Sequence, residues 1–251
     1  MRNRKELNRC IVQSLKDGRF YERFVEAQIK INFPQSFCKH IEDFDDNMVF
    51  RVDGKQCTKT EVDEKYHIDL FLKFDKNKER MQSMDAKSPK RLKRQDTSYN
   101  YDIEYVEFTN VNGEEGWVRG RADFIAFVTN VDIIIVSRHW LFGYSNDIVK
   151  PNTPIYIGNI ADKYPNDYLH KLSRRKDRKD LITILSTEEI RKIAKEQNGL
   201  IMQFDKSIDW NQIDQMRKNG EDVTELLDVD ATVIDYRKQE TKQINYKKRD
   251  V

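Results

Sequence analysis

Apolar residues recur at helical spacing over the first forty residues of the chain. Their positions are Leu7, Ile11, Leu15, Phe20, Phe24, Ala27 and Ile31. Because residues three or four positions apart share one face of a helix, this spacing predicts helical structure. Asp17-Gly18 interrupts the pattern, so we expect two helices that meet at the glycine.

Runs rich in β-branched and aromatic residues follow, and they predict strands. These runs cover residues 66–72, 81–87, 104–109, 122–129, 131–136 and 180–185. A hairpin-like turn over residues 75–79 joins the first two runs, and Gly113, Gly116 and Gly120 mark turns between the next two. The run 131–136 is apolar without alternation, which indicates a strand that is covered on both faces.

Turn-forming and helix-capping residues mark the connections after these strands. Residues 140–168 contain three prolines and two glycines, which favours a long loop. Ser186 and Glu189 form a capping box, which predicts a helix over residues 188–196 that ends at Asn198-Gly199.

The pattern as a whole predicts an α/β fold with two parts. Residues 1–200 should form a mixed β-sheet core of four to six strands flanked by helices. Beyond residue 200 charged and amide side chains become frequent, and the last dozen residues contain almost no apolar ones. We therefore expect residues 201–251 to form a helical or partly disordered C-terminal appendage.

The composition of the 251 residues fits a globular chain with a sizeable core, since 38% are hydrophobic and 11% aromatic. There are 45 Lys and Arg residues against 43 Asp and Glu residues, so the formal net charge is only +2. This balance excludes a uniformly basic nucleic-acid coat. No apolar window approaches a membrane span, and the first residues contain no apolar signal-peptide stretch, so we expect a cytoplasmic protein.

Cysteine and histidine usage limits the kind of metal site that the chain can form. Cys10, Cys38 and Cys57 contain no CxxC pair, which indicates reduced thiols rather than a disulfide framework or a zinc ribbon. The four histidines are scattered along the sequence. A bound metal should therefore be held by oxygen ligands, the preference of Mg²⁺.

The most informative motif is Asp85-Ala86-Lys87 at the end of a predicted strand, sixteen positions after Asp69 on the preceding one. Alternate residues of a strand point to the same face, so Asp85 and Lys87 project together and Asp69 can join them. Two carboxylates and an ammonium at one place suit metal-assisted phosphodiester hydrolysis. The first predicted helices add a third carboxylate, either Glu22 or Glu26, and position alone does not decide between them.

Glu22, Asp69 and Asp85-x-Lys87 follow the order E, D, (D/E)xK, and in this the chain resembles the PD-(D/E)xK nuclease superfamily. The opening Gly-x-x-x-Glu-Arg at residues 18–23 is similar to archaeal Holliday junction resolvases, and residues 105–127 and 174–180 look like bacteriophage proteins of that fold. The resemblance covers about residues 18–195. No proline precedes Asp69, and an aspartate takes the place of the commoner glutamate before the lysine, which leaves the preferred metal open.

The resemblance implies a restriction-endonuclease-like core and a Mg²⁺-dependent deoxyribonuclease. A phage origin and a role in recombination, repair or host-DNA degradation are left open by it. It implies that Asp69 and Asp85 bind Mg²⁺, or alternatively Mn²⁺, that the carbonyl of Ala86 adds a ligand, and that Glu22 binds a second ion or its water. Lys87 would orient the hydrolytic water or stabilise charge on the phosphoryl group. Branched or single-stranded DNA as substrate, and a homodimer like that of resolvases, are left open.

Two basic runs near the motif are candidates for binding the phosphate backbone of DNA. They comprise Lys90, Arg91, Lys93 and Arg94, then Arg174, Arg175 and Lys176. Tyr99, Tyr101 and Trp117 could stack on an unpaired base, although Trp117 between glycines also suits a packed turn.

Several less specific interpretations stay open at this point. Asp69, Asp85 and Lys87 could form a surface ion-pair ladder, and Glu22 could pair with Arg19 or Arg23. The chain could bind nucleic acid without cleaving it. It could also be a phage protein that binds and inhibits a host protein.

Overall fold

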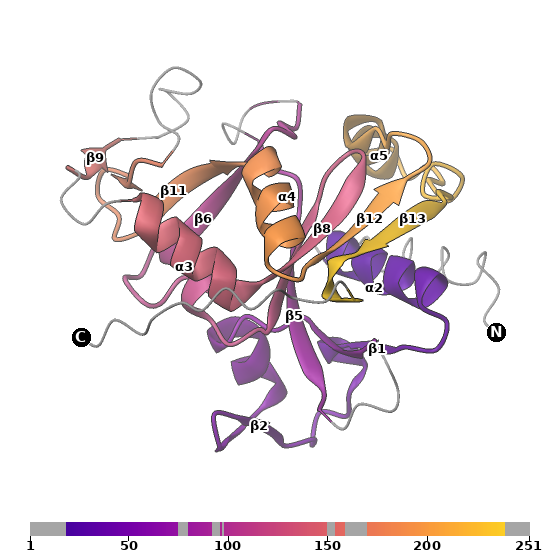
Figure 1. Ribbon diagram of the computed structural model, residues 1–251, viewed down its shortest axis with the longest axis horizontal. Coiled ribbons are helices and arrows are strands. Elements are labelled where there is room, and N and C mark those ends of the chain that lie inside the picture. Colours follow the sequence, from indigo (N-terminus) through magenta and orange to yellow (C-terminus); the bar gives the residue numbers. More distant parts are fainter. Residues whose placement is uncertain are drawn as a thin grey trace.

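The computed structural model describes residues 19–74, 80–91, 96, 98–149, 154–158 and 170–238. The fold is mixed α/β: a curled, mixed β-sheet is flanked by helices (Figure 1). Seven strands form the main sheet in the order β1-β4-β5-β7-β8-β12-β13. Their bounds are Phe37–His40, Leu70–Lys73, Gln82–Lys87, Phe124–Val128, Asp132–Ser137, Leu200–Phe204 and Ala231–Asp235. Only β5 and β7 run parallel among these neighbours.

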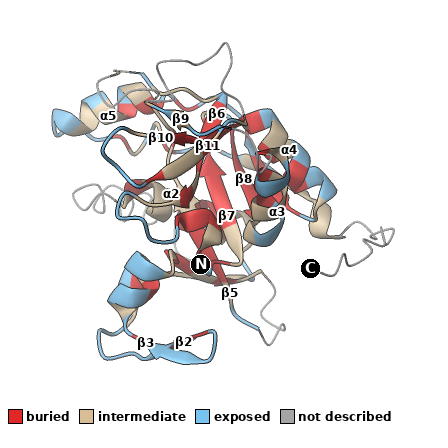
Figure 2. Ribbon diagram, turned by 90° about the vertical axis from the view of Figure 1, so that its left-hand side faces the viewer, coloured by how far each residue is buried: buried red, intermediate tan, exposed pale blue. Residues whose placement is uncertain are grey.

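A second sheet and a hairpin extend from this main sheet. The second sheet has the order β6-β11-β10-β9, with bounds Ile103–Thr109, Leu181–Ser186, Ser173–Arg174 and Tyr156–Ile157. The hairpin joins β2 (Phe50–Val52) to β3 (Lys55–Cys57) and projects from the body with many exposed residues (Figure 2). Short helical turns are η2 (Ile41–Asp43), the π-helix η3 (Glu61–Lys65), η4 (Trp117–Arg119) and η6 (Tyr236–Lys238).

The main sheet separates two hydrophobic cores. One core contains the buried residues of α2 (Phe20–Asn32) and α5 (Trp210–Lys218). The other contains those of α3 (Arg138–Ile148), α4 (Thr187–Glu196) and the second sheet. Along β5, Met84 and Ala86 pack on the α2 side, so the alternation of a strand turns the Asp85-x-Lys87 motif toward the second sheet.

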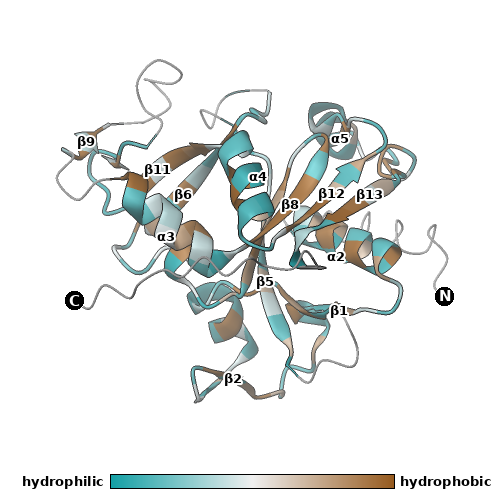
Figure 3. Cartoon of the chain, viewed as in Figure 1, coloured by the Kyte–Doolittle hydropathy of each residue, from teal (hydrophilic) through white to brown (hydrophobic). Residues whose placement is uncertain are grey.

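The strand predicted over residues 131–136 is confirmed as β8, and so is its coverage on both faces. Ile133 and Ile135 belong to the α2 core, whereas Ile134 and Val136 belong to the opposite core. Figure 3 shows β8 as mainly hydrophobic along its length, while α4 turns largely hydrophilic residues toward the viewer. The capping box is also confirmed: the Ser186 hydroxyl accepts from the Glu189 N–H, and the Glu189 carboxylate accepts from the Ser186 N–H.

Other predictions from the pattern need correction. The strand expected over 66–72 begins only at Leu70, because Tyr66 ends η3 and His67 has a positive φ of 52°. The loop expected over 140–168 is wrong in its first part, where α3 buries Leu141 and Ser145 one turn apart. The prolines of this stretch all follow that helix. The first predicted helix and the turn over 75–79 lie outside the described residues.

The appendage expected from residue 201 is wrong over its described part, residues 201–238. Strand β12 pairs with β8 on one side and with β13 on the other, so it is an inner strand of the main sheet. Trp210 of α5 is fully buried against Phe20 and Phe24 of α2. The composition of residues 201–251 as a whole is dominated by charged and amide side chains, which obscured the short apolar segments within it. In the described residues, no helix is both long and apolar enough to cross a membrane.

Candidate active site

The predicted pair Asp85 and Lys87 lies together on β5. The Lys87 ammonium Nζ is 2.6 Å from Oδ2 of Asp85, and the two side chains are only 15% and 3% exposed. The Trp117 ring covers the ammonium, with its centroid 4.9 Å from Nζ. Because Trp117 is itself buried and also packs on Phe127, its interpretation as a packed turn aromatic is confirmed.

Asp69 joins this pair from the residue that precedes β4. Its backbone N–H donates to the Met84 carbonyl at 2.9 Å, and its carbonyl accepts from the Ile41 N–H at 2.7 Å. Its side-chain Oδ2 accepts from the Ala86 N–H at 2.7 Å. Since β4 begins only at Leu70, the Asp69 carboxylate supplies the partner that a strand backbone would otherwise give to Ala86.

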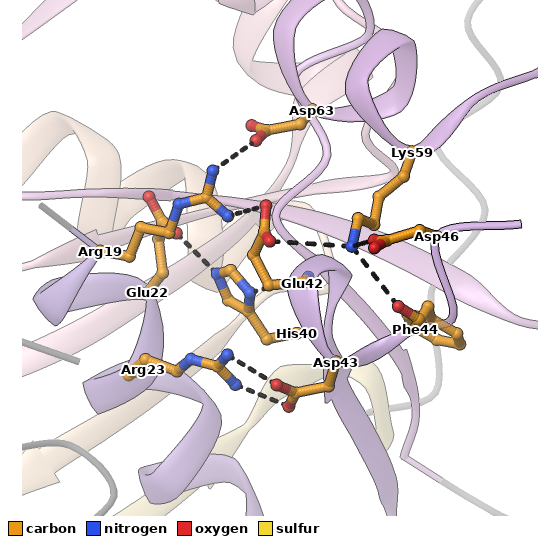
Figure 4. A network of polar contacts seen from close by, with 10 residues as sticks. All are labelled: Arg19, Glu22, Arg23, His40, Glu42, Asp43, Phe44, Asp46, Lys59 and Asp63. Atoms are coloured by element: carbon orange, nitrogen blue, oxygen red, sulfur yellow. Dashed lines mark hydrogen bonds and ion pairs between the residues drawn. The ribbon is translucent and has the colours of Figure 1, made fainter. Parts of the chain in front are cut away.

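Glu22 is the helix carboxylate whose charge acts on this group. It lies in the first turn of α2, and its Oε2 is 2.7 Å from Nε2 of His40 (Figure 4). Its negative charge acts on Asp69. Among the described residues Glu22 forms no direct ion pair with Arg19 or Arg23, although its charge acts on Arg19. Arg19 binds Glu42 and Asp63 instead, and Arg23 binds Glu26 and Asp43. We refer to Glu22, Asp69, Asp85 and Lys87 as the acidic cluster.

Glu26, the other helix candidate, is bound elsewhere. Its two carboxylate oxygens are 2.9 Å from Arg23 and 2.5 Å from Lys30, and its side chain is buried. A carboxylate that already bridges two cations has little charge left for a metal ion. The geometry therefore favours Glu22 over Glu26 as the helix member of the site.

Burial and the neighbouring charges shift the pKa values of two members of the acidic cluster, Asp69 and Lys87. Burial, and then the charges of Asp85 and Glu22, raise the pKa of Asp69 well above its ordinary value. Burial alone would lower the pKa of Lys87, but the charges of Asp85 and Asp69 outweigh it and raise this pKa. Lys87 is thus a permanent ammonium at neutral pH, surrounded by carboxylates that repel one another.

The donors of the acidic cluster are of the right chemical kind for Mg²⁺ or Mn²⁺. Among the described residues, no three Asp, Glu, His or Cys side chains are already gathered as a metal-ligand group. The carboxylates of Asp69, Asp85 and Glu22 nevertheless offer only oxygen, the atom that Mg²⁺ prefers. The carbonyl of Ala86 lies on the same edge of β5 as its N–H, which faces Asp69. The donor chemistry of these residues therefore fits a divalent cation that prefers oxygen.

The described members of the first basic run, Lys90 and Arg91, are engaged within the fold. Arg91 pairs with Asp214 of α5 at 2.8 Å and stacks over the Tyr99 ring, so it joins two parts of the fold. Tyr99 also donates its hydroxyl to Asp214 at 2.6 Å. Lys90 is half-buried, and burial lowers its pKa. Lys93 and Arg94 lie outside the described residues.

The second basic run is more exposed. Arg174 and Lys176 are exposed at the second sheet, whereas Arg175 pairs with the buried Asp180 at 2.5 Å. The charges of Arg175, Asp180 and Lys87 all act on Glu107 of β6. This run therefore lies on the side of the molecule toward which Lys87 points. Of the predicted phosphate contacts, Arg174 and Lys176 keep the exposure that the role requires.

Three nearby residues were not singled out by the sequence pattern as site residues. His40 contacts Glu22 directly. Glu104 and Glu107 of β6 lie close enough to Lys87 for its positive charge to act on their carboxyl groups. Glu104 is buried, its Oε2 has no hydrogen-bond partner in the described structure, and burial raises its pKa to about 8. The only available signal was the presence of two glutamates, Glu104 and Glu107, within the otherwise apolar run Ile103–Phe108. No sequence spacing connects His40 with Glu22.

Comparison with protein-family models, with curated proteins and with solved structures finds no match in any of the three. Function must therefore be argued from the acidic cluster itself.

Proposed function

We propose that this chain is a metal-dependent DNA nuclease with a restriction-endonuclease-like core of the PD-(D/E)xK kind. One observation carries the proposal: the buried carboxylates of Asp85 and Asp69 act on the Lys87 ammonium at β5, and the charge of Glu22 on α2 acts on Asp69. Structural ion pairs normally balance their charges, whereas this group keeps an excess of negative charge. Oxygen donors with a fixed lysine are what hydrolysis of a phosphodiester bond requires.

Asp69, Asp85 and Glu22, with the carbonyl of Ala86, would hold Mg²⁺, and Mn²⁺ would serve as an alternative. When bound, the ion would lower the pKa of its water and neutralise charge on the phosphate. In the reaction, the oxygen of a water molecule bonds to phosphorus and one P–O bond to the sugar breaks, which leaves a phosphate monoester and a hydroxyl group. No histidine base is needed in this scheme.

Lys87 supplies positive charge rather than proton transfer. Its raised pKa keeps the side chain as an ammonium, so it cannot accept a proton from water at neutral pH. Its Asp85 partner and the Trp117 ring limit its movement. We infer that Lys87 stabilises the negative charge that develops on the phosphoryl oxygens. Arg174 and Lys176 would bind the DNA backbone farther from the cleaved bond.

The test uses labelled duplex, single-stranded and branched DNA, each with Mg²⁺, Mn²⁺ or a chelator. We expect cleavage with either ion and none with the chelator. Either ion should also raise the melting temperature, since a ligand at 100 times its Kd stabilises a protein by about 2.7 kcal/mol. DNA that is bound but never cut under any ion would contradict the proposal and indicate a catalytically silent binding protein. Parallel assays with RNA define the substrate class.

A further inference from the structure

His40 is a fully buried histidine whose two ring nitrogens are both engaged. It is the last residue of β1, an edge strand of the main sheet. Its Nδ1 accepts a hydrogen bond from the Glu42 N–H at 3.2 Å, and its Nε2 lies 2.7 Å from Oε2 of Glu22. Figure 4 shows the ring between these two partners, pointing at the Glu22 carboxylate.

These two contacts determine where the ring proton lies. A backbone N–H can only donate, so Nδ1 of His40 must be the acceptor. A neutral imidazole then carries its single proton on Nε2. The Glu22 carboxylate is an acceptor, and it therefore receives the Nε2–H of His40. This contact fixes the direction of the carboxylate without neutralising its charge.

The end of β1 holds two members of the acidic cluster through consecutive residues. The His40 side chain binds Glu22 of α2, and the next backbone N–H, that of Ile41, donates to the Asp69 carbonyl at 2.7 Å. His40 also pairs in register with Leu70, the residue after Asp69. One short piece of backbone thus sets the helix carboxylate and the strand carboxylate relative to each other.

We propose that His40 is a positioning residue that orients the Glu22 carboxylate toward a divalent cation shared with Asp69. This inference rests on the proposed nuclease function. A purely structural histidine would tie α2 to β1 but would leave metal affinity unchanged. The contrast with Glu26 supports positioning, because that carboxylate directly contacts two cations, whereas the direct contact of Glu22 is with the His40 ring.

The test compares His40→Asn with His40→Gln. The Asn amide reaches about as far as Nδ1 and can keep the Glu42 contact, whereas the Gln amide reaches about as far as Nε2 and can still donate to Glu22. Binding of Mn²⁺ without DNA is measured by titration calorimetry. We expect His40→Asn to weaken Mn²⁺ binding by about 10–100-fold, the usual cost of losing a partner that orients a metal ligand. His40→Gln should remain within a few-fold of the wild type.

Asp43→Asn is the matched control. Asp43 also ties α2 to the segment after β1, through two contacts of 2.7 Å with Arg23, but neither contact involves the acidic cluster. This variant should lose stability without changing the affinity for Mn²⁺. Equal Mn²⁺ affinity in His40→Asn and the wild type would overturn the positioning role while leaving the nuclease function intact. A wild-type protein that neither binds Mn²⁺ nor cleaves DNA would instead contradict the nuclease function.

A second measurement does not depend on any His40 variant folding. The imidazole Nε2–H of His40 should give a slowly exchanging NMR signal, since the ring is fully buried. Saturating Mg²⁺ should shift this signal in the wild type but not in Glu22→Gln. No shift in a wild-type protein that binds Mg²⁺ would overturn the proposal.

Discussion

Two groups of charged side chains meet helix α2 one turn apart, and they differ in their charge balance. The balanced group consists of Arg23, Lys30, Glu26 and Asp43, whose two cations and two carboxylates are joined by direct contacts of 2.5–2.9 Å. Such an arrangement satisfies every formal charge within the protein. Its contacts link successive turns of α2 and connect α2 to η2. No bound cation is required to neutralise its carboxylates.

The acidic cluster has the opposite property. Glu22, Asp69 and Asp85 contribute three carboxylates, and Lys87 contributes the one ammonium. The formal remainder of two negative charges is what one Mg²⁺ would neutralise. Charge balance, rather than residue type or burial, thus separates a structural carboxylate from a candidate ligand on the same helix.

The largest expected difference between the two groups comes from changing one lysine in each. Lys87→Met removes the only cation of the acidic cluster, and we expect DNA cleavage at saturating Mg²⁺ to fall by about 10²–10³-fold or more. Lys30→Met removes a cation of the balanced group and should leave cleavage within a few-fold. Single-turnover cleavage rates measure both effects. Equal losses in the two variants would show that charge balance does not mark the site.

The two glutamates give a second matched pair. Glu26→Gln breaks two charged contacts of a buried side chain and should lower the free energy of unfolding by about 1.5–3 kcal/mol, without changing Mn²⁺ affinity. Glu22→Gln should do the reverse, with a small change in stability and weaker Mn²⁺ binding. Urea denaturation and titration calorimetry measure the two quantities. A metal effect in Glu26→Gln alone would reverse our choice of helix ligand.

Glu104 extends the comparison to a buried carboxyl whose Oε2 has no hydrogen-bond partner among the described residues and on which burial outweighs the charges of Lys90 and Lys87. Its pKa in the folded protein is about 8 and its ordinary value is 4.5. Between these pH values the folded state keeps a proton that the unfolded state releases, so stability falls as pH rises, by at most about 1.4 kcal/mol per pH unit from this group. Glu104→Gln should flatten that slope. Urea denaturation at pH 5, 6.5 and 8 checks it, and an unchanged slope would contradict the assignment.

The smallest effect concerns the basic residues. Arg174→Ala and Lys176→Ala should each reduce the dependence of log affinity on log salt concentration by about 0.9, the value for one phosphate contact on duplex DNA. Arg91→Ala should instead destabilise the fold, because Arg91 pairs with Asp214. DNA binding in Ca²⁺ at several salt concentrations separates the two classes. An altered salt slope in Arg91→Ala alone would reverse their roles.

Local signals in the sequence predicted most of the central fold. The alternation around Asp85-x-Lys87 and the capping box at Ser186 each depend on a few neighbouring residues, and both were confirmed. Strands β12 and β13 were missed because they are short apolar runs of five residues each, and the composition was averaged over the charged segments on either side of them. The late start of β4 was missed because the positive φ of His67 has no signature in its residue type.

The site was predicted in part for similar reasons. Strand periodicity brings Asp85 and Lys87 together whatever the rest of the chain does. Glu22 and Glu26 are one helical turn apart, so periodicity places both on one face and cannot choose between them. Their difference arises from His40, Arg23 and Lys30, and the contact with His40 crosses from α2 to the edge strand β1. Such tertiary contacts cannot be derived from spacing.

The burial of Trp210 against α2 has a consequence for the order of events during synthesis. Phe20, Tyr21 and Phe24 leave the ribosome early, yet the indole ring that packs on all three belongs to a residue made almost two hundred positions later. Glu22 lies among these aromatic residues on the same helix. In a nascent chain the core around α2 therefore stays incomplete until α5 emerges, and a premature stop before Trp210 would leave the helix that carries Glu22 without this packing partner.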